Sequence, residues 1–339
     1  MRPHLAILFT ILQLLSVPAS ALEQVNIYSA QKEHLIRPIL DVFEKQSGIK
    51  VNVTTGKKAE LISRLALEGK NTPADILLTA DIGNIYQAKK QGLLQPIVSK
   101  VLTDKIPAHL RDPENIWYGF TVRARTIFYN NQLTNAEAID SYLQLADPKW
   151  KGKLLIRSSS NIYNQSLVAF MLHQYGEEKT LAWAKGVVAN MARPPQGGDT
   201  DQLRALAAGE GEIAVANTYY YGRLLGGDES VQDTHVQERV GIIFPDQQDA
   251  GMHVNIRGGG VTAHAKNKEN AIKLLEFLTT DEAQKYFAHH NFEYPAVANV
   301  KAHPVVEKWM KAKQYDANLE ALGKLQTQAV AIMDKAGWK

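Results

Sequence analysis

The chain has 339 residues, of which 45% are hydrophobic and 22% charged, with a formal net charge of +3 and no cysteine. This composition is typical of a folded globular protein, and the length is enough for two domains. The lack of cysteine excludes disulfides, zinc–thiolate sites, iron–sulfur clusters and a cysteine nucleophile. The small, dispersed net charge, without a basic stripe of interleaved aromatics, gives no basis for nucleic-acid binding.

The first 21 residues have the pattern of a secretory signal peptide. Arg2 supplies a positive start, an apolar run covers residues 5–17, and Ala19-Ser20-Ala21 has the small-x-small form of a cleavage site. The apolar run is too short to span a bilayer comfortably, and no later stretch of about 18 apolar residues replaces it. We therefore expect cleavage near Ala21 and a mature protein that works outside the cytoplasm. A retained membrane anchor is the alternative.

The first third of the mature chain alternates predicted strands with predicted helices. Ser29 is expected to cap the first of these helices. The order strand–helix–strand–helix–strand predicts a parallel sheet with helices on both faces, and such sheets bind ligands beyond the carboxyl ends of their strands. The strands are expected at 24–28, 49–53 and 74–80, and the helices between Ser29 and Gly48, at about 59–68 and up to Gly92.

Two segments are predicted to cross between this unit and a second one. Tyr118 to Tyr129 is a long strand, a second α/β unit runs from 154 to 244, and residues 253–261 form a return strand. The glycines of that return strand permit close backbone approach or bending. Two crossings between two α/β units predict a hinged clamshell that holds its ligand in the cleft. Helices are expected at about 266–279, 281–289 and 317–336.

Three consecutive tyrosines stand directly after a strand of the second unit. Tyr219, Tyr220 and Tyr221 follow the strand at 212–217 and begin the next helix. A phenol at this position lies at the carboxyl end of a strand and near the positive end of a helix dipole. Adjacent tyrosines cannot all face one core, so at least one should project elsewhere. Ordinary aromatic packing is the alternative for such a triplet.

A second strand-then-turn arrangement precedes Tyr163. The strand near 154–157 leads into a serine run that includes Ser159, and then into Asn161. These residues can cap a helix and offer backbone N–H groups to an anion, with Tyr163 in the first turn of that helix. An ordinary capped helix is the alternative interpretation.

The order of these features resembles the periplasmic ferric-iron-binding proteins of ABC transporters, over essentially the whole mature chain. The tyrosine pair in Asn217-Thr218-Tyr219-Tyr220 is the most specific match. The other matching segments are Tyr28-Ser29-Ala30-Gln31-Lys32-Glu33, Thr72-Pro73-Ala74-Asp75, Arg123-Ala124-Arg125, residues 159–165, Gly209-Glu210 and Glu293-Tyr294-Pro295.

The resemblance implies a two-lobed α/β clamshell of the type II-like periplasmic binding proteins, with two hinge crossings. Residues 22–122 and 257–300 would form lobe 1, and residues 123–256 and 301–339 would form lobe 2. It also implies a periplasmic monomer that binds Fe(III) in the interlobe cleft, with a synergistic anion such as carbonate, and passes it to an ABC permease.

The ligand set that the resemblance implies is Tyr163, Tyr219 and Tyr220, with Tyr221 as a packing aromatic. One branch of the family adds a histidine after the first strand and a glutamate after the third. Here Lys32 and Ala80 stand at those positions, and His34 is two residues out of register. The chain resembles more closely the branch that uses a third tyrosine and an anion instead.

Three phenolates suit Fe(III), because this hard cation prefers oxygen donors and their charges cancel its own. A tyrosine normally ionises near pH 10, so holding a phenolate at pH 7 costs about 4 kcal/mol, which a bound metal can more than offset. Iron binding should therefore release protons and weaken as the pH falls.

Arg123, on the first crossing strand, is the candidate for holding the anion, since an arginine can pair with an oxyanion through two parallel hydrogen bonds. A surface arginine or a structural salt bridge is the alternative. Arg125 lies on the same face in a regular strand and on the opposite face across a bulge, so the sequence does not separate the two. Arg257, Asp81 and Gln31 are further candidates for the cleft.

Two other functions compete with iron binding. A carrier of a small organic or inorganic anion would equally explain the basic residues and capped helices, but it has no need of three phenolates. An enzyme such as a metal-assisted hydrolase is the other class. The sequence has no Gly-x-Ser-x-Gly elbow, no His-Glu-x-x-His and no phosphate-binding loop, so we expect no enzyme activity.

Overall fold

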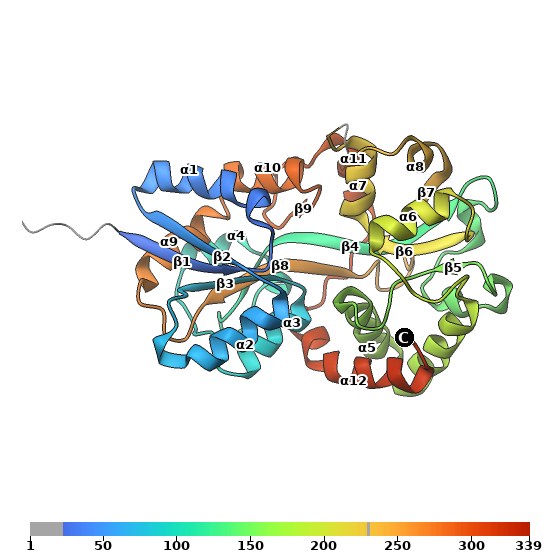
Figure 1. Cartoon of the computed structure of the whole chain (residues 1–339), viewed down its shortest axis with the longest axis horizontal. Coiled ribbons are helices and arrows are strands. Elements are labelled where there is room, and N and C mark those ends of the chain that lie inside the picture. The colour runs from blue at the N-terminus through green and yellow to red at the C-terminus, as the bar shows by residue number, and fades with distance from the viewer. Residues whose placement is uncertain (1–22, 229–230) are drawn as a thin grey trace, which may run out of the picture.

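The structure is a computed structural model that describes residues 23–228 and 231–339 (Figure 1). The expected signal peptide and its cleavage near Ala21 lie outside the described residues. Within those ranges, no helix has the length and apolar character needed to cross a membrane.

The first lobe is built on a sheet whose strand order is β2-β1-β3-β8. The first three strands are parallel, as the sequence predicts, but β8 pairs with β3 in the antiparallel direction, so the sheet is mixed. Figure 1 shows α1 and α10 on one side of these strands and α2 and α3 on the other. The strands are β1 (Gln24–Ser29), β2 (Lys50–Thr55), β3 (Ile76–Ala80) and β8 (Val254–Val261), and the helices are α1 (Arg37–Ser47), α2 (Lys58–Glu68), α3 (Ile82–Lys90), α4 (Lys100–Lys105), α9 (Lys268–Phe277) and α10 (Asp281–His290).

The start of α1 differs from the prediction. Ser29 is the last residue of β1 and does not cap a helix, because a 3-10 turn at Glu33–Leu35 comes first and α1 begins only at Arg37. The Ser29 hydroxyl instead accepts a hydrogen bond from the backbone N–H of Gln31. The chain therefore makes an extra bend at the carboxyl end of β1, where it lines the cleft.

The second lobe is a smaller sheet covered by helices. Its longest helix, α5, is broken at Gly176, whose φ of 76° and ψ of 174° leave the helical region. The strands are β5 (Leu154–Leu155), β6 (Ile213–Asn217) and β7 (Val240–Ile243), and the helices are α5 (Ile162–Asn190), α6 (Asp199–Ala207), α7 (Thr218–Gly226), α8 (Thr234–Arg239) and α11 (Pro304–Glu307).

The long strand β4 (Tyr118–Asn130) joins the two sheets, as predicted. Residues 118–124 pair with β8, and residues 125–129 pair with β6. The short strand β9 (Tyr294–Pro295) also pairs with β4. The glycines of β8 are required by close packing of strands, since a Cβ at Gly259 would lie 1.8 Å from the carbonyl oxygen of Leu77. β4 and β8 are thus the two crossings of the clamshell.

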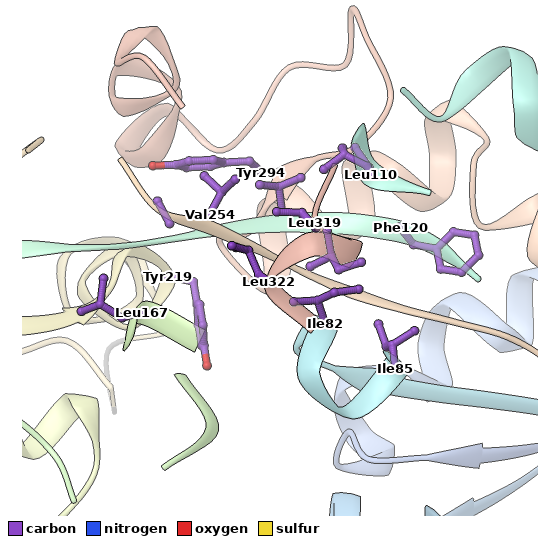
Figure 2. Close-up of a cluster of buried hydrophobic side chains, with 14 of the residues drawn as sticks. Ile82, Ile85, Leu110, Phe120, Leu167, Tyr219, Val254, Tyr294, Leu319 and Leu322 are labelled. Atoms are coloured by element: carbon purple, nitrogen blue, oxygen red, sulfur yellow. The ribbon is translucent and has the colours of Figure 1, made fainter. Parts of the chain in front are cut away.

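The C-terminal helix α12 (Glu320–Ala336) makes a third connection. It packs along α5 and also against α3, so it contacts helices of both lobes. The contact with α3 is close, because a Cβ at Gly323 would lie 2.6 Å from the Cβ of Tyr86. Figure 2 shows the buried cluster at this junction, where Ile82 of α3 lies near Leu322 of α12 beneath the crossing strands.

Candidate functional site

A cavity of about 700 Å³ lies between the lobes. Its walls come from the ends of β1 and β3 and the start of α2 on one side, and from the first turns of α5 and α7 on the other. Five lysine and arginine side chains line it, against a single acidic one, Asp228. The described lining is therefore strongly cationic.

The three tyrosines predicted as ligands meet in this cavity. Tyr163 is the second residue of α5 and Tyr219 the second residue of α7, so both stand in a first helical turn, as the sequence predicts. Their hydroxyl oxygens are 3.4 Å apart. The ring of Tyr220 lies against that of Tyr219 with centroids 4.2 Å apart. Figure 2 shows the hydroxyl of Tyr219 directed away from the crossing strands.

Tyr221 does not belong to this group. It is buried in the lobe, stacked on Trp309 with ring centroids 5.4 Å apart, and its hydroxyl donates to the carbonyl oxygen of Val240 at 2.5 Å. This is the packing role that the resemblance implies. The triplet therefore divides as the helix geometry demands, with its third ring on a different face of α7.

Arg123 lies at the floor of the cavity, beside the phenols. Its side chain is 2% exposed, and its Nη1 donates to the hydroxyl of Tyr163 at 3.4 Å. Its guanidinium also lies 5.4 Å from the ring centroid of Tyr219. Nε and Nη2 of Arg123 have no hydrogen-bond partner in the protein. Buried donors without partners are costly, so this guanidinium is suited to an oxyanion.

The carboxylate of Glu293 pairs with both Arg123 and Arg257. Arg257 Nη2 donates to Glu293 Oε1 at 2.7 Å, and Arg123 Nη2 lies 3.5 Å from the same oxygen. Thr121 donates to the other carboxylate oxygen at 2.5 Å. Burial raises the pKa of Glu293, but the two arginines outweigh it and lower that pKa below its ordinary value. The carboxylate thus stays ionised and offsets one of two buried cations.

Arg125 has a structural role instead. Its Nη2 donates to the side-chain oxygen of Asn164 at 2.5 Å, and its Nη1 donates to that of Asn217 at 3.1 Å and to Asp199 at 3.2 Å. Asp199 also accepts from the backbone N–H of Asn217. Because Asn164 follows Tyr163 and Asn217 begins the turn before Tyr219, this buried hub fixes the two tyrosine-bearing turns relative to each other.

The charges around the phenols separate their pKa values. Burial raises the pKa of Tyr163, but Lys58, Arg123 and a hydrogen bond with Tyr219 outweigh it and lower the pKa to about 8. Burial and the neighbouring phenols raise the pKa of Tyr219 well above its ordinary value, and raise that of Tyr220 to about 12. Tyr163 is therefore the first of the three to ionise.

The lobe 1 candidates fall into two groups. Gln31, Lys32, His34 and Ala80 all line the cavity. Asp81 lies behind the wall and accepts hydrogen bonds from Ser166 of α5 at 2.5 Å, Asn255 of β8 at 2.9 Å and Gly83 at 2.9 Å. It joins the lobes rather than facing a ligand. Among described residues, no group of three or more histidines and acids is arranged to hold a metal.

Ser159 and Asn161, expected to bind the anion, do not line the cavity. The Asn161 side chain caps α5 by accepting from the N–H of Asn164 at 3.3 Å, which is the local role that the sequence indicates. The N–H of Ser159 donates to the carbonyl oxygen of Lys339, which takes up the group that an anion would need. The geometry gives this assignment no support, because these groups are used within the protein.

Three residues of the site carry roles that the sequence does not assign. Asp199, the first residue of α6, anchors Arg125, and Glu293 belongs to a matching segment to which the sequence assigns no role of its own. Lys58, the first residue of α2, donates from Nζ to the hydroxyl of Tyr163 at 3.4 Å across the cleft. No sequence signal distinguishes it from its neighbour Lys57.

The comparisons with known proteins identify the family. Residues 71–319 match the family described as bacterial extracellular solute-binding protein. The chain belongs to this family. Iron uptake protein A1 of Synechocystis sp. is 45% identical to this solute-binding protein over 317 residues, which cover 94% of the chain and 88% of that relative. The Fe(3+)-binding periplasmic protein of Serratia marcescens is 30% identical, over 94% of the chain and 92% of its own length.

A solved structure agrees over the same range. The structure of FutA (IdiA) from Trichodesmium in complex with iron and citrate has 46% sequence identity and a TM-score of 0.88. The match covers 93% of this chain and 100% of that one. The two-lobed α/β clamshell predicted from the sequence is thereby confirmed.

Proposed function

We propose that this protein captures Fe(III) between its lobes outside the cytoplasm, as the periplasmic component of an iron transporter. Tyr163, Tyr219 and Tyr220 bind the ion as phenolates. The observation that carries the proposal is the convergence of these phenols, with the Tyr163 and Tyr219 oxygens 3.4 Å apart beside a buried arginine. The names of the relatives in Synechocystis and Serratia support the same cargo.

The chemistry of the donors fits a ferric ion. Three phenolates carry three negative charges and only oxygen atoms, which suits a small trivalent cation. At its ordinary pKa of 10, a tyrosine costs about 4 kcal/mol to hold as phenolate at pH 7, whereas at about 8 it costs about 1.4 kcal/mol. Lys58 and Arg123 thus prepare the first phenolate before the metal supplies the rest.

A synergistic oxyanion such as carbonate completes the coordination of the iron. Arg123 is the residue that holds it, since two of its buried nitrogen atoms have no hydrogen-bond partner in the protein. Ser159 and Asn161 are left out of the anion site for the reasons given above.

The lobes close on the loaded site, and the closed form is the one delivered to a membrane permease. We assign residues 22–122 and 257–300 to lobe 1 and residues 123–256 and 301–339 to lobe 2, with α12 in contact with helices of both. The protein acts as a monomer, after removal of its first 21 residues.

The test is a spectrum. Metal-free protein is mixed with ferric citrate and bicarbonate, and a visible tyrosinate-to-iron charge-transfer band is sought beside the double variant Tyr219→Phe, Tyr220→Phe. Tyr221→Phe is the matched control, because it removes a phenol from the same helix that does not face the cavity. A band in the wild type and the control, but not in the double variant, supports the proposal. No band in any of the three refutes it.

A second function is favoured by one observation, the excess of cationic side chains in the cavity wall. Such a wall also suits a small organic or inorganic anion carried without iron. Calorimetric titration of metal-free protein with citrate, phosphate and bicarbonate distinguishes the two. Tight binding of one of these anions in the absence of iron, together with the lack of a visible band, would establish the anion carrier.

A further inference from the structure

Lys58 is a lobe 1 residue that reaches the phenols of lobe 2. Its Nζ is 3.4 Å from the hydroxyl oxygen of Tyr163 and 4.5 Å from the centroid of that ring. In the part of the chain that the structure describes, it is the one side chain of lobe 1 that forms a hydrogen bond with the three tyrosines. Lys57, its neighbour, turns outward with 86% of its side chain exposed.

An ammonium group cannot be a ligand of Fe(III), because it has no lone pair to donate and carries a like charge. It can only bind an oxygen that carries negative charge. The rest of the lobe 1 wall has no described carboxylate, and its polar side chains include Gln31, Lys32, Thr79 and the histidines His34, His289 and His290. The lysines of lobe 1 are thus equipped to meet an anionic surface and not the metal itself.

Whether the loaded site presents an anionic surface to lobe 1 depends on its net charge. Three phenolates cancel the charge of Fe(III), so the tyrosine–iron centre alone is neutral. An oxyanion added to it leaves a net negative charge that faces lobe 1. Tyr163 remains within reach as well, because a phenolate bound to iron keeps a lone pair that can accept a hydrogen bond.

We propose that Lys58 is the positioning residue through which lobe 1 closes on the loaded site, by donating to an anionic oxygen there. This inference rests on the proposed iron function. The oxygen belongs either to the phenolate of Tyr163 or to the oxyanion on the iron. In the first case closure follows the ionisation of Tyr163, and in the second it follows the net negative charge of the oxyanion-bearing centre. Either way it is a device for retaining iron once it is bound.

The test compares Lys58→Met with Lys58→Arg, which keeps the charge, and with Lys57→Met, which removes the adjacent exposed lysine. Each protein is loaded with iron, with and without bicarbonate. Three quantities are measured: the visible band, the radius of gyration by small-angle scattering, and the rate of iron release to a competing chelator. We expect all four proteins, wild type included, to show the band, because the phenols remain.

Lys58→Met should stay extended on loading and release iron about tenfold faster than wild type, as expected for the loss of a charge-assisted hydrogen bond. Its band should move to longer wavelength, since a phenolate without this donor is a better electron donor. Lys58→Arg and Lys57→Met should behave as wild type. A Lys58 effect only with bicarbonate identifies the oxyanion as the partner, and the same effect without bicarbonate identifies Tyr163.

Lys58→Met that compacts and releases iron as wild type does would overturn the inference while leaving iron binding intact. Absence of the band in every protein would overturn the proposed function and this inference with it. The two failures are therefore distinguished by the spectrum.

Discussion

In the proposed mode of binding, the pKa values of the three phenols determine how many protons are released when iron binds. Each phenol that is neutral before iron binds must lose its proton, so binding releases protons and the affinity rises with pH. The pKa of Tyr163 is about 8, whereas burial raises the pKa of Tyr219 well above its ordinary value and that of Tyr220 to about 12. Tyr163 should therefore stop contributing a proton at a pH where the other two still do.

The variant to be compared with wild type is Tyr163→Phe. With a pKa of about 8, Tyr163 is about 97% protonated at pH 6.5 and about 9% protonated at pH 9. Wild type should thus release about one proton more per bound iron than the variant at pH 6.5, and about 0.1 more at pH 9. Tyr219 and Tyr220 remain protonated at both pH values, so their contributions cancel in the difference.

The assay is a titration of weakly buffered, metal-free protein with ferric nitrilotriacetate, in which the released protons are counted by back-titration with base. The visible band gives the amount of iron bound, so that proton release is expressed per iron. Protons that come from the chelator are the same for both proteins and also cancel. Equal release by the two proteins at pH 6.5 would refute Tyr163 as a ligand, and a difference unchanged at pH 9 would refute its lowered pKa.

Three further predictions concern the scaffold. Arg125→Met leaves the buried Asp199 without its main cation, so the free energy of unfolding in urea should fall by about 3 kcal/mol; a loss below 1 kcal/mol would contradict the structural role of Arg125. Gly259→Ala would bring its Cβ within 1.8 Å of the Leu77 carbonyl oxygen, so the melting temperature should drop by about 5 °C, corresponding to about 3 kcal/mol; unchanged melting would show that β8 has room to move. Burial raises the pKa of Asp246 from 3.8 to about 6, so its charge destabilises the fold increasingly above about pH 4 and in full above pH 6; Asp246→Asn should add about 3 kcal/mol at pH 7 and nothing at pH 3.5, and equal stability of the two proteins at pH 7 would contradict the raised pKa.

Most of the fold follows from local patterns in the sequence. The spacing of apolar residues predicts β1, β2, β3 and the helices between them, because the alternation of side chains in strands and the helical period are set by backbone geometry. The crossing strand β4 is also predictable, since its length exceeds what one sheet of this size needs. The antiparallel direction of β8 is not, because it depends on how the chain returns from the second lobe.

The tyrosines could be placed because their setting is local. Each of Tyr163 and Tyr219 stands in the first turn of a helix that follows a strand, which places them at the cleft end of the sheet, and the resemblance implies which of the tyrosines face the cavity. The two arginines of β4 show where local reasoning stops. Arg123 meets Tyr163 and Arg125 meets the adjacent Asn164, so both lie on one face as in a regular strand. Arg125 is a structural residue because it pairs with Asp199, which belongs to a helix distant in the sequence.

The proposed metal ligands lie on lobe 2, whereas Lys58 lies on lobe 1. This division explains why Lys58 is not predicted from the sequence and why the site can work without the lobe 1 histidine and glutamate of the other family branch. All three phenols belong to elements of the second lobe, and their oxygens can take up the ion without help from the first. A histidine or glutamate on lobe 1 would tie closure to the metal. In the proposed mechanism Lys58 ties it instead to the phenolate of Tyr163 or to the oxyanion. Where the oxyanion is the partner, iron without it should be held on an open protein and a complete ferric–oxyanion centre on a closed one. In that case selection of the cargo occurs at closure, because only the assembled ferric–oxyanion centre carries a net negative charge.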